Sequence, residues 1–453
     1  MSTVGTRLSM SPFTARIRRE TCEVWYHSIT GRARRLSAAQ ADVVTRLLTA
    51  EDALEAAPAR AVVEHLRTQG FLVADPKAER ERAHRDYLTR RDQISDLFLT
   101  VAPTMACNLH CDYCFQAGSP ALPRMSRTVQ QAMVDLVGAW LDTPLESDQG
   151  RALVVQWFGG EPLLARETLL RCTAGMLARA EHAGVGYDAE LLTNGLLLPT
   201  RGVRELLPRL HLSAVHISLD GNAASYAERK GVPPAQARRL YERLASCLPE
   251  ILEVVGRIVL RVNVDRRNVE ETGSLLEFLA ARGAADRRVL VRLGQIGVSD
   301  GDCRAHDCLS GARFTSAEVA LAALARTWGF GAQGLPEPLL WTCGATLRRH
   351  VTVGPDGVLG RCVPEIGAVG DGDTSQHRGT VRTITDTDSV DLVRRLRARG
   401  LGHECFDPYR EPGCDNCPLI GTCLGACPRD RQSAWADPCP ARQNLEERIV
   451  AFA

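Results

Sequence analysis

The 453-residue sequence predicts an α/β fold: a partial (β/α)6, TIM-like barrel between an N-terminal winged-helix-like module and a C-terminal Cys-rich domain. Three observations carry this prediction. Six apolar, strand-like runs alternate with helical patterns in the middle of the chain, strands precede helices near the start, and cysteines crowd the last quarter. Alternating strands and helices with right-handed crossovers give a parallel sheet. Six units are too few for a closed eight-stranded barrel, so we expect a partial one, with chemistry at its C-terminal strand ends.

Residues 1–75 form the first predicted unit. A hairpin is expected around Thr30-Gly31, because these turn residues follow a β-rich run. Two short amphipathic helices should follow, at 37–48 and 59–68. The highly charged residues 76–95 predict an exposed linker.

Residues 96–300 carry the predicted barrel. Its strands are expected at 97–102, 153–158, 187–192, 214–219, 258–264 and 289–293, with helices at 128–141, 167–182, 236–248 and 270–281. Cys172 and Cys247 fall within helical patterns and should be buried core thiols. After residue 300 the repeat stops, which leaves a bridging region at 301–340. Residues 341–453 are Gly/Pro-rich and Cys-rich, so we expect bound metal to hold them together.

The composition excludes several classes of protein. Hydrophobic residues make up 45% and charged residues 24%, which excludes a mainly disordered chain. A net charge of +1 gives no general reason to expect nucleic acid or anionic lipid as a partner. No apolar run is long enough to span a membrane, and the polar segment 1–19 lacks an apolar signal region. We therefore expect a cytoplasmic protein, in which most of the 16 cysteines are not disulfides.

Three cysteines directly follow the first barrel strand. Cys107, Cys111 and Cys114 are spaced by four and then three residues. A [4Fe–4S] cluster normally takes four thiolates, so three would leave one iron open to a substrate or cofactor. A structural zinc site is the alternative. The position at a C-terminal strand end favours a functional cluster.

The CxxxCxxC spacing, with Tyr113 before the last cysteine, resembles the radical S-adenosylmethionine (SAM) superfamily. Gly159-Gly160-Glu161 follows the second strand and resembles that family's GGE motif. The resemblance implies that this backbone and the Glu161 carboxylate hold the ammonium group of SAM. The physics agrees, because glycines allow close approach and a carboxylate pairs with an ammonium. A simple tight turn is the alternative.

Three further residues match family elements near the cofactor. Asn194 follows the third strand and Ser218 ends the fourth. Turn and capping chemistry would explain both residues equally well. Arg229 stands where relatives place an arginine for the SAM carboxylate, and a surface salt bridge is the alternative.

The C-terminal cysteines resemble the SPASM domain, which in relatives binds two auxiliary [4Fe–4S] clusters. The resemblance implies that cluster II is held by Cys414, Cys417, Cys423 and Cys439, and cluster I by Cys343, Cys362 and Cys427. Pro428 follows Cys427, and in ferredoxin-type runs the cysteine before such a proline ligates the other cluster. Two zinc sites in a ribbon-like fold are the alternative.

Two departures from the family pattern concern cluster I. No cysteine stands shortly before Cys343, so this cluster has an open iron or borrows Cys303, Cys308 or Cys405. In sulfatase-maturing relatives an aspartate follows the second SPASM cysteine and acts as a base. Here that residue is Val363, which counts against formylglycine formation.

The resemblance implies a peptide-modifying enzyme with three [4Fe–4S] clusters and SAM as cofactors. Reductive cleavage of SAM would give a 5′-deoxyadenosyl radical, which abstracts hydrogen from a residue of a ribosomally made precursor peptide. A thioether or carbon–carbon crosslink would result. The expected partners are the precursor peptide and a one-electron reductant of flavodoxin or ferredoxin type, with no nucleic acid and no membrane.

Residues 1–75 resemble precursor-recognition elements that pair a leader peptide with a sheet edge; a structural cap over the barrel is the alternative. Two other functions remain open for the whole chain. One is a sulfatase-maturing dehydrogenase, and the other is a non-catalytic Fe–S electron carrier. The GGE-type motif argues against a carrier, which needs no SAM pocket.

Overall fold

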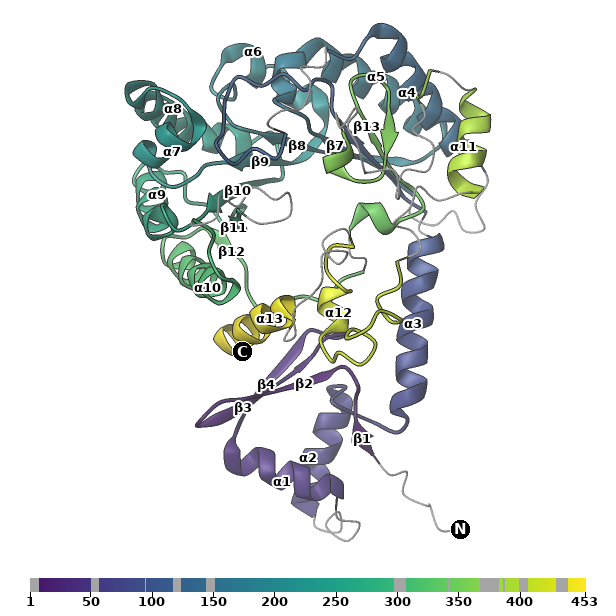
Figure 1. Ribbon diagram of the computed structural model, residues 1–453, viewed down its shortest axis with the longest axis vertical. Helices are drawn as coiled ribbons and strands as arrows, with labels where there is room; N and C mark the ends of the chain where they lie inside the picture. Colours follow the sequence, from purple (N-terminus) through teal and green to yellow (C-terminus); the bar gives the residue numbers. More distant parts are fainter. Residues whose placement is uncertain are drawn as a thin grey trace.

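The computed structural model describes most of the chain. The described ranges are 8–49, 57–93, 95–116, 124–143, 151–296, 307–340, 343–366, 383–385, 388–398, 406–428 and 439–453. Within them the chain forms a large strand-and-helix body, a small N-terminal unit, and a C-terminal segment between the two (Figure 1).

The N-terminal unit is a three-stranded antiparallel sheet with two helices. Its elements are β1 (Ser9–Met10), β2 (Thr14–Arg18), β3 (Cys22–His27), β4 (Arg32–Ser37), α1 (Ala38–Thr49), α2 (Ala57–Thr68) and β5 (Leu72–Val73). The sheet order is β2-β3-β4, and β1 pairs separately with β5. Gly31 adopts φ +69° between β3 and β4, which confirms the hairpin. Trp25, Val44 and Phe71 form the centre of its apolar core. The winged-helix assignment stays a prediction.

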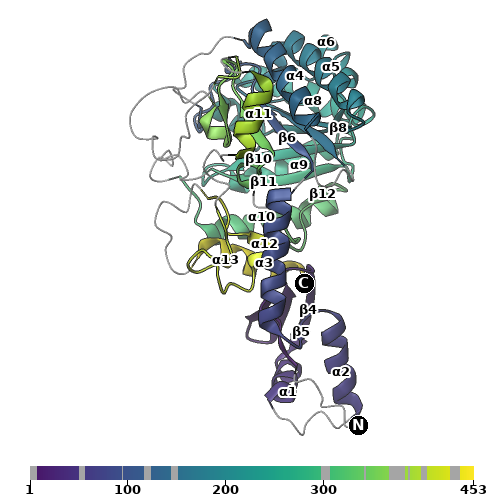
Figure 2. The same cartoon turned by 90° about the vertical axis from the view of Figure 1, so that its right-hand side faces the viewer.

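The charged segment after this unit is one helix, α3 (Pro76–Gln93). It runs from the N-terminal unit up to the large body (Figures 1 and 2). Many of its charged side chains are exposed, while Tyr87 is buried.

Six parallel strands lie side by side in chain order, which confirms the six predicted strands. They are β6 (Leu97–Val101), β7 (Ala152–Trp157), β8 (Gly186–Thr193), β9 (Leu212–Ser218), β10 (Arg257–Val264) and β11 (Val289–Gln295). The short strand β12 (Gly331–Ala332) extends the β11 edge in parallel. At the other edge, β13 (His350–Val353) pairs with β6 in parallel, and β14 (Leu359–Gly360) pairs with β13 in antiparallel. The C-terminal segment therefore completes the sheet, which the sequence analysis did not anticipate.

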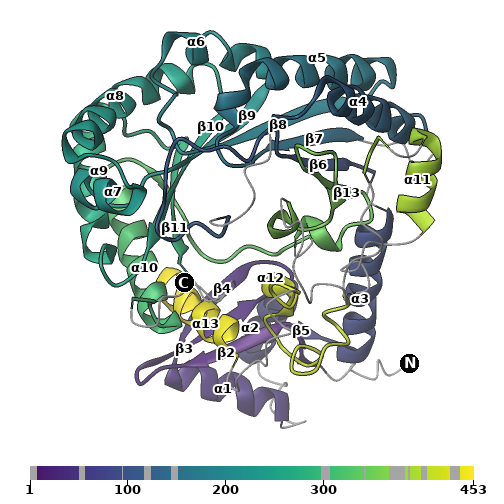
Figure 3. The same cartoon turned by 45° about the horizontal axis from the view of Figure 1, so that its top comes forward.

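Helices cover the outer face of this curved sheet (Figure 3). They are α4 (Arg127–Leu141), α5 (Arg166–His182), α6 (Arg201–Arg204), α7 (Ala223–Lys230), α8 (Pro234–Leu252), α9 (Thr272–Ala280) and α10 (Gly311–Thr327). Short 3-10 turns lie at Pro162–Ala165, Leu207–Leu210 and Val269–Glu271. The apolar core lies between sheet and helices and includes Cys172 and Cys247, as predicted. No described helix is long and apolar enough to cross a membrane.

The C-terminal region has little regular structure. Its described elements are 3-10 turns at Gly344–Thr346 and Val363–Glu365, α11 (Ser389–Ala398), α12 (Ile420–Cys423) and α13 (Pro440–Phe452). The N-terminal sheet packs against α12 and α13 (Figure 1), with Tyr26, Leu419 and Ile449 in one buried cluster. The Tyr26 hydroxyl also donates to the carbonyl of Pro336 at 2.6 Å.

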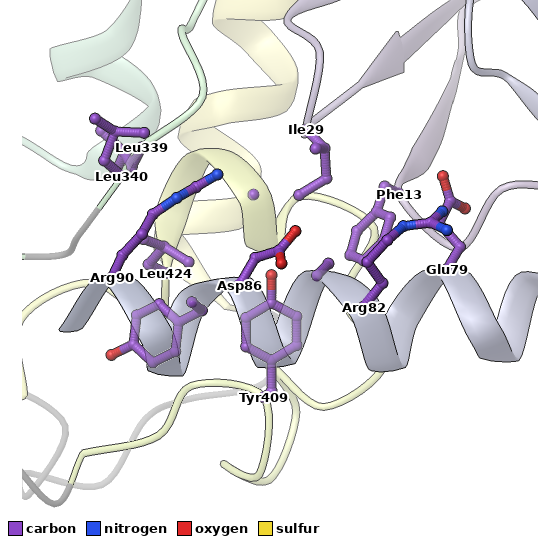
Figure 4. A pocket seen from close by; sticks show the side chains of 13 residues that line it. Phe13, Ile29, Glu79, Arg82, Asp86, Arg90, Leu339, Leu340, Tyr409 and Leu424 are labelled. Atoms are coloured by element: carbon purple, nitrogen blue, oxygen red, sulfur yellow. The ribbon is translucent and has the colours of Figure 1, made fainter. Parts of the chain in front are cut away.

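A pocket of about 130 Å³ opens where the two ends of the chain meet α3 (Figure 4). Phe13, Tyr409 and Leu424 lie at its apolar base, and Arg82 and Asp86 of α3 stand at its edge. The pocket lies within the contact between the N-terminal unit and the Cys-rich segment.

Candidate functional site

The predicted cluster loop begins directly after β6, at the C-terminal end of the sheet. Burial raises the pKa of Cys107 and Cys111, and the neighbouring thiols of the loop raise both values further. Cys107, Cys111 and Cys114 therefore lie within electrostatic reach of one another. No three His, Cys, Asp or Glu side chains in the described ranges converge on one point where a single metal ion could sit. The thiolates that hold a cubane cluster need not converge on one point, because each of them binds a separate iron.

The loop rests on the glycines after β7. The amide of Gly160 donates to the carbonyl of Thr104 at 3.1 Å, and that of Glu161 to Ala106 at 2.9 Å. A Cβ on Gly160 would lie 2.4 Å from the carbonyl oxygens of Met105 and Ala106, and Gly159 has φ +123°. Only glycine permits this approach. In this structure the two glycines therefore let the cysteine loop reach the end of β7.

Glu161 is fully buried and accepts four hydrogen bonds at its carboxylate. The donors are the amides of Leu163 (3.0 Å) and Asn194 (2.8 Å) and the hydroxyl of Thr193, which reaches both oxygens (2.9 and 3.0 Å). No cation in the described part of the chain forms an ion pair with it. Burial raises the pKa of Glu161 to about 7, although these donors oppose the shift. A buried carboxylate without a cation fits the ammonium group of a ligand such as SAM.

The end of β8 connects Glu161 to the cysteine loop. The Asn194 side chain donates to Asn108 Oδ1 at 2.8 Å and to Cys107 Sγ at 3.8 Å. Gly195, with φ +83°, turns the chain there. Thr193 belongs to the Thr193-Asn194-Gly195 stretch that matches a family element after the third strand, but its hydrogen bonds to Glu161 were not predicted from the sequence. Ser218 ends β9 and is half-buried; its predicted cofactor contact remains a prediction.

Arg229 is 2% exposed, so the alternative of a surface salt bridge is wrong. Its Nη1 pairs with Asp265 Oδ2 at 2.7 Å, and its guanidinium lies 4.9 Å from the centre of the Tyr113 ring. Nε and Nη2 are buried without hydrogen-bond partners. These two donors fit an anionic ligand group such as the SAM carboxylate. Arg267 links Asp265 to Asp112 in the cysteine loop, at 3.1 and 2.7 Å.

A second buried group beside the loop was also missed. Lys230, Asp220 and Asn263 surround the hydroxyl of Tyr113. The sequence places Lys230 in the last turn of a helix, where a basic residue is ordinary, so only the structure shows its burial.

Charged side chains line the inner face of the sheet, because polar residues alternate with buried apolar ones along the strands. Glu190 on β8 pairs with His216 on β9 at 3.2 Å and with Arg257 at 3.6 Å. Arg261 and Arg292 stand opposite each other on β10 and β11 and are exposed.

The C-terminal cysteines fall into two neighbourhoods. Burial, with smaller contributions from Cys414, Cys439 and Cys417, raises the pKa of Cys423 to about 11. Burial also raises the pKa of Cys343, with Cys427 as an additional cause. Cys362 begins the 3-10 turn after β14, where the Glu365 carboxylate accepts its amide at 3.2 Å. Their roles as ligands stay predictions.

The backbone between Cys423 and Cys427 explains why Cys427 does not group with Cys414, Cys417 and Cys423. Leu424, Gly425 and Ala426 all have positive φ, at 45°, 79° and 58°. This run reverses the chain after Cys423 and carries Cys427 toward Cys343. Left-handed backbone is costly for residues with a Cβ, so surrounding packing must hold it. Leu424 is accordingly buried, at 2% exposed.

Cys308 is disulfide-bonded, which removes it as a free fourth ligand for cluster I and corrects the expectation of free thiols at this position. Cys303 and Cys405 lie outside the described residues. His110 in the cluster loop is exposed.

No family model matches the chain. It is 28% identical over 171 residues to molybdenum cofactor biosynthesis protein 1 of Drosophila melanogaster, which covers 36% of this chain and 27% of that protein. It is 31% identical over 121 residues to a serine-type anaerobic sulfatase-maturating enzyme of Klebsiella aerogenes, which covers 26% of this chain and 28% of that protein. The matches span under a third of the length of each of these curated relatives.

Solved structures match over far more of the chain. The structure of anSMEcpe with bound AdoMet gives a TM-score of 0.58 at 17% identity, covering 79% of this chain and 96% of that one. Streptococcus suis SuiB bound to precursor peptide SuiA gives 0.50 at 15% identity, covering 96% and 98%. Identities this low show a shared fold alone. The chain thus shares a fold with anSMEcpe and SuiB, and parts of it are similar to the two curated relatives, in agreement with the radical SAM resemblance of the cysteine spacing at 107–114.

Proposed function

We propose that the chain binds SAM at a [4Fe–4S] cluster held by Cys107, Cys111 and Cys114 and modifies a ribosomally made peptide. One observation carries this proposal. Cys107, the first of the three thiols, lies within electrostatic reach of Glu161, a buried carboxylate that has no cationic partner in the described ranges. Desolvating such a charge is expensive unless a ligand compensates it. When bound, the cluster and SAM supply one-electron cleavage to a carbon-centred radical.

The chain's own residues bind and orient the cofactor in this proposal. Glu161 accepts the SAM ammonium while Thr193 and two backbone amides hold its carboxylate in place. Arg229 offers Nε and Nη2 to the SAM carboxylate while Asp265 holds Nη1. Asn194 fixes the loop at Cys107. The inner sheet face then holds the substrate near the radical, which is a matter of positioning.

Two features support a precursor peptide as the substrate. The strand β4 pairs with β3 on one side, and no strand in the described ranges pairs with its other edge. A peptide can add to such an edge, and Arg32, Arg34 and Arg35 on β4 would favour an acidic leader. The fold is also that of SuiB, a structure that contains a precursor peptide.

The proposed product is a thioether or carbon–carbon crosslink. Closing either bond between a substrate radical and an S–H or C–H group releases one electron and one proton; we propose that the auxiliary clusters at the C-terminal cysteines accept the electron and that the proton passes to solvent. An external one-electron reductant of flavodoxin or ferredoxin type supplies the first electron.

Formylglycine formation is the second candidate. The match to the Klebsiella sulfatase-maturating enzyme and the anSMEcpe fold favour it as much as the SuiB structure favours a precursor peptide as substrate. Val363 is the residue that counts against it. A carbonyl-reactive hydroxylamine probe separates the two, since it labels formylglycine and leaves a crosslinked peptide unlabelled. The peptide to use is one encoded by a short reading frame beside the gene.

Anaerobically reconstituted protein, reduced with dithionite and given SAM, should produce 5′-deoxyadenosine. Cys111→Ala is the matched control and should produce none. Wild-type protein that holds iron and binds SAM but makes no 5′-deoxyadenosine would leave only the electron-carrier function.

A further inference from the structure

Two arginines stand side by side on the sheet without a carboxylate partner. Arg261 of β10 lies directly opposite Arg292 of β11 in the parallel register. Both side chains are exposed, and neither forms an ion pair with a residue in the described part of the chain. Like charges directly opposite each other on neighbouring strands are destabilising. The fold therefore accepts a cost at this place, which a bound anion would remove.

The alternation of side chains along each strand turns both arginines toward the inner face of the sheet. Leu260 and Val262, the neighbours of Arg261 on β10, belong to the apolar core between sheet and helices. Successive side chains of a strand point to opposite faces, so Arg261 points away from the helices that cover the outer face (Figure 3). The neighbours of Arg292 on β11 are core residues as well, so Arg292 points the same way.

The inner face connects Arg261 to the cysteine loop. A Cβ on Gly294 of β11 would lie 2.6 Å from Arg261 Nε and from Asn263 Oδ1, so this glycine leaves the room that both side chains occupy. Arg261 Nε donates to Asn263 Oδ1 at 2.9 Å, and Asn263 Nδ2 donates to the hydroxyl of Tyr113 in the cysteine loop at 3.3 Å. One side chain thus separates Arg261 from the loop. Its two terminal nitrogens have no hydrogen-bond partner among the described residues.

The surroundings of Arg292 are positively charged. Although its side chain is exposed, partial loss of hydration is the largest cause that lowers the pKa of its guanidinium, and Arg257 and Arg448 lower it further. Glu190 and Glu337 act in the opposite direction, each with a smaller effect than either arginine. The cations therefore prevail over the carboxylates around this side chain.

We propose that Arg261 and Arg292 bind a carboxylate of the substrate peptide and thereby determine which of its residues meets the radical. The inference rests on the proposed function and adds a specificity-determining pair to it. The planar guanidinium of arginine matches a carboxylate with two parallel hydrogen bonds. A carboxylate held one side chain away from the cysteine loop fixes the distance along the peptide from that anchor to the reacting residue. Its source is an Asp or Glu side chain or the C-terminus of the peptide.

The experiment measures kcat/KM of the reconstituted full-length protein with the peptide encoded by a short reading frame beside the gene. In a scan of that peptide, each Asp is replaced by Asn and each Glu by Gln, one at a time, and a further peptide carries an amidated C-terminus. We expect one of these changes to lower kcat/KM by roughly 10–100-fold, because a carboxylate bound by two guanidinium groups is lost. The position of that change identifies the source of the carboxylate.

The double variant Arg261→Gln/Arg292→Gln removes the two charges. In this variant the same peptide change should lower kcat/KM by less than about twofold, because the carboxylate no longer has its partners. Arg239→Gln is the matched control and should keep the full wild-type effect, since Arg239 is an exposed arginine on the outer helix α8. Arg292→Gln alone takes the place of the double variant if that protein does not fold, and it should reduce the effect of the peptide change by about threefold or more.

Two results would overturn the proposal. One is a wild-type protein that tolerates the loss of every carboxylate in the peptide, which requires no variant of the enzyme. The other is a scan in which each carboxylate has the same effect in wild type and in the arginine variant. Wild-type protein that cleaves no SAM or leaves the peptide unmodified would instead show that the proposed function itself fails.

Discussion

The loop at 107–114 and the C-terminal cysteines at 414–439 are held in place in different ways. The loop stands on strand ends: the amides of His110 and Asp112 donate to the carbonyls of Lys230 and Arg229, and the Asp112 carboxylate pairs with Arg267. The C-terminal cysteines lie on turns and on the four-residue helix α12, and much of their support comes from the N-terminal sheet. The comparison teaches that the first site is built by the scaffold, whereas the second has little regular structure of its own, so we expect bound metal to contribute to its folding.

The largest expected effect comes from replacing the cysteines of each region and comparing the iron content and the unfolding midpoints of the two variants. We expect about 12 irons per chain, from three cubanes. Replacing Cys107, Cys111 and Cys114 with alanine should remove about four irons and all SAM cleavage, with little change in thermal unfolding. Replacing Cys414 and Cys423 should also remove iron and should lower the unfolding midpoint by more than about 10 °C, since a lost metal site costs several kcal/mol. Equal midpoints for the two variants would contradict the comparison.

Gly160→Ala should damage the scaffold-built site without unfolding the chain. The new Cβ would meet two carbonyl oxygens of the cysteine loop at 2.4 Å, so the loop must move. We expect loss of the SAM-sensitive cluster signal. Gly186→Ala is the matched control, since its nearest neighbour would be 3.6 Å away. A Gly160→Ala protein with normal iron content and SAM cleavage would show that the close approach is dispensable.

Glu161 should make stability depend on pH when SAM is absent. Its pKa is raised to about 7 in the fold from 4.5, so the unfolded chain loses this proton first. Wild-type stability should therefore fall, relative to Glu161→Gln, as pH rises from 4.5 through 7, by up to about 3 kcal/mol. Urea unfolding of both proteins at pH 5 and pH 8 measures this difference. A constant difference between the two pH values would argue against a buried, uncompensated carboxylate.

The same substitution tests the ligand. Glu161→Gln should weaken SAM binding by roughly 10–150-fold, because losing a charge-assisted hydrogen bond costs about 1.5–3 kcal/mol. Equilibrium binding of SAM to the reconstituted variant provides the measurement. Unchanged affinity would mean that Glu161 only joins the ends of β7 and β8.

The smallest expected effect lies in the ligand-dependent region. Ala426 has φ +58°, so Ala426→Gly should stabilise the protein by up to about 1 kcal/mol. Ala132→Gly, within the helix α4, is the control and should destabilise by about the same amount. Thermal unfolding of both variants and of wild type shows whether each substitution raises or lowers the stability of the protein. A destabilised Ala426→Gly protein would show that the turn is not strained.

The sequence predicts the repeating part of this molecule well, because local periodicity determines it. The six barrel strands and the hairpin at Gly31 follow from short-range patterns. The pairing of β13 with β6 does not, since Thr100 and His350 are 250 positions apart. The Cys107–Cys114 loop and Glu161 were found by their spacing, which is itself local.

The parts of the site that sequence reasoning missed are long-range and polar. Lys230 meets Tyr113 across 117 positions, and nothing around either residue marks the pair. Asp265 similarly acquires its role only from what the fold brings to it. Arg229 was identified by position, but its burial depends on Asp265. Buried polar contacts of this kind have no periodicity from which they could be predicted.

The packing of the N-terminal sheet on α12 and α13 has a consequence for synthesis of the chain. The hydroxyl of Ser28 accepts the amide of Gly421, which is 393 positions away. At ribosomal rates of roughly 5–20 residues per second, that separation takes about 20–80 s to translate. Throughout this interval the apolar face formed by Ile17, Val24 and Tyr26 lacks the partner that later covers it. Because that partner lies among the C-terminal cysteines, this nascent surface is covered only after almost the whole chain has been made, and the time needed for translation sets how long the new chain remains open to aggregation.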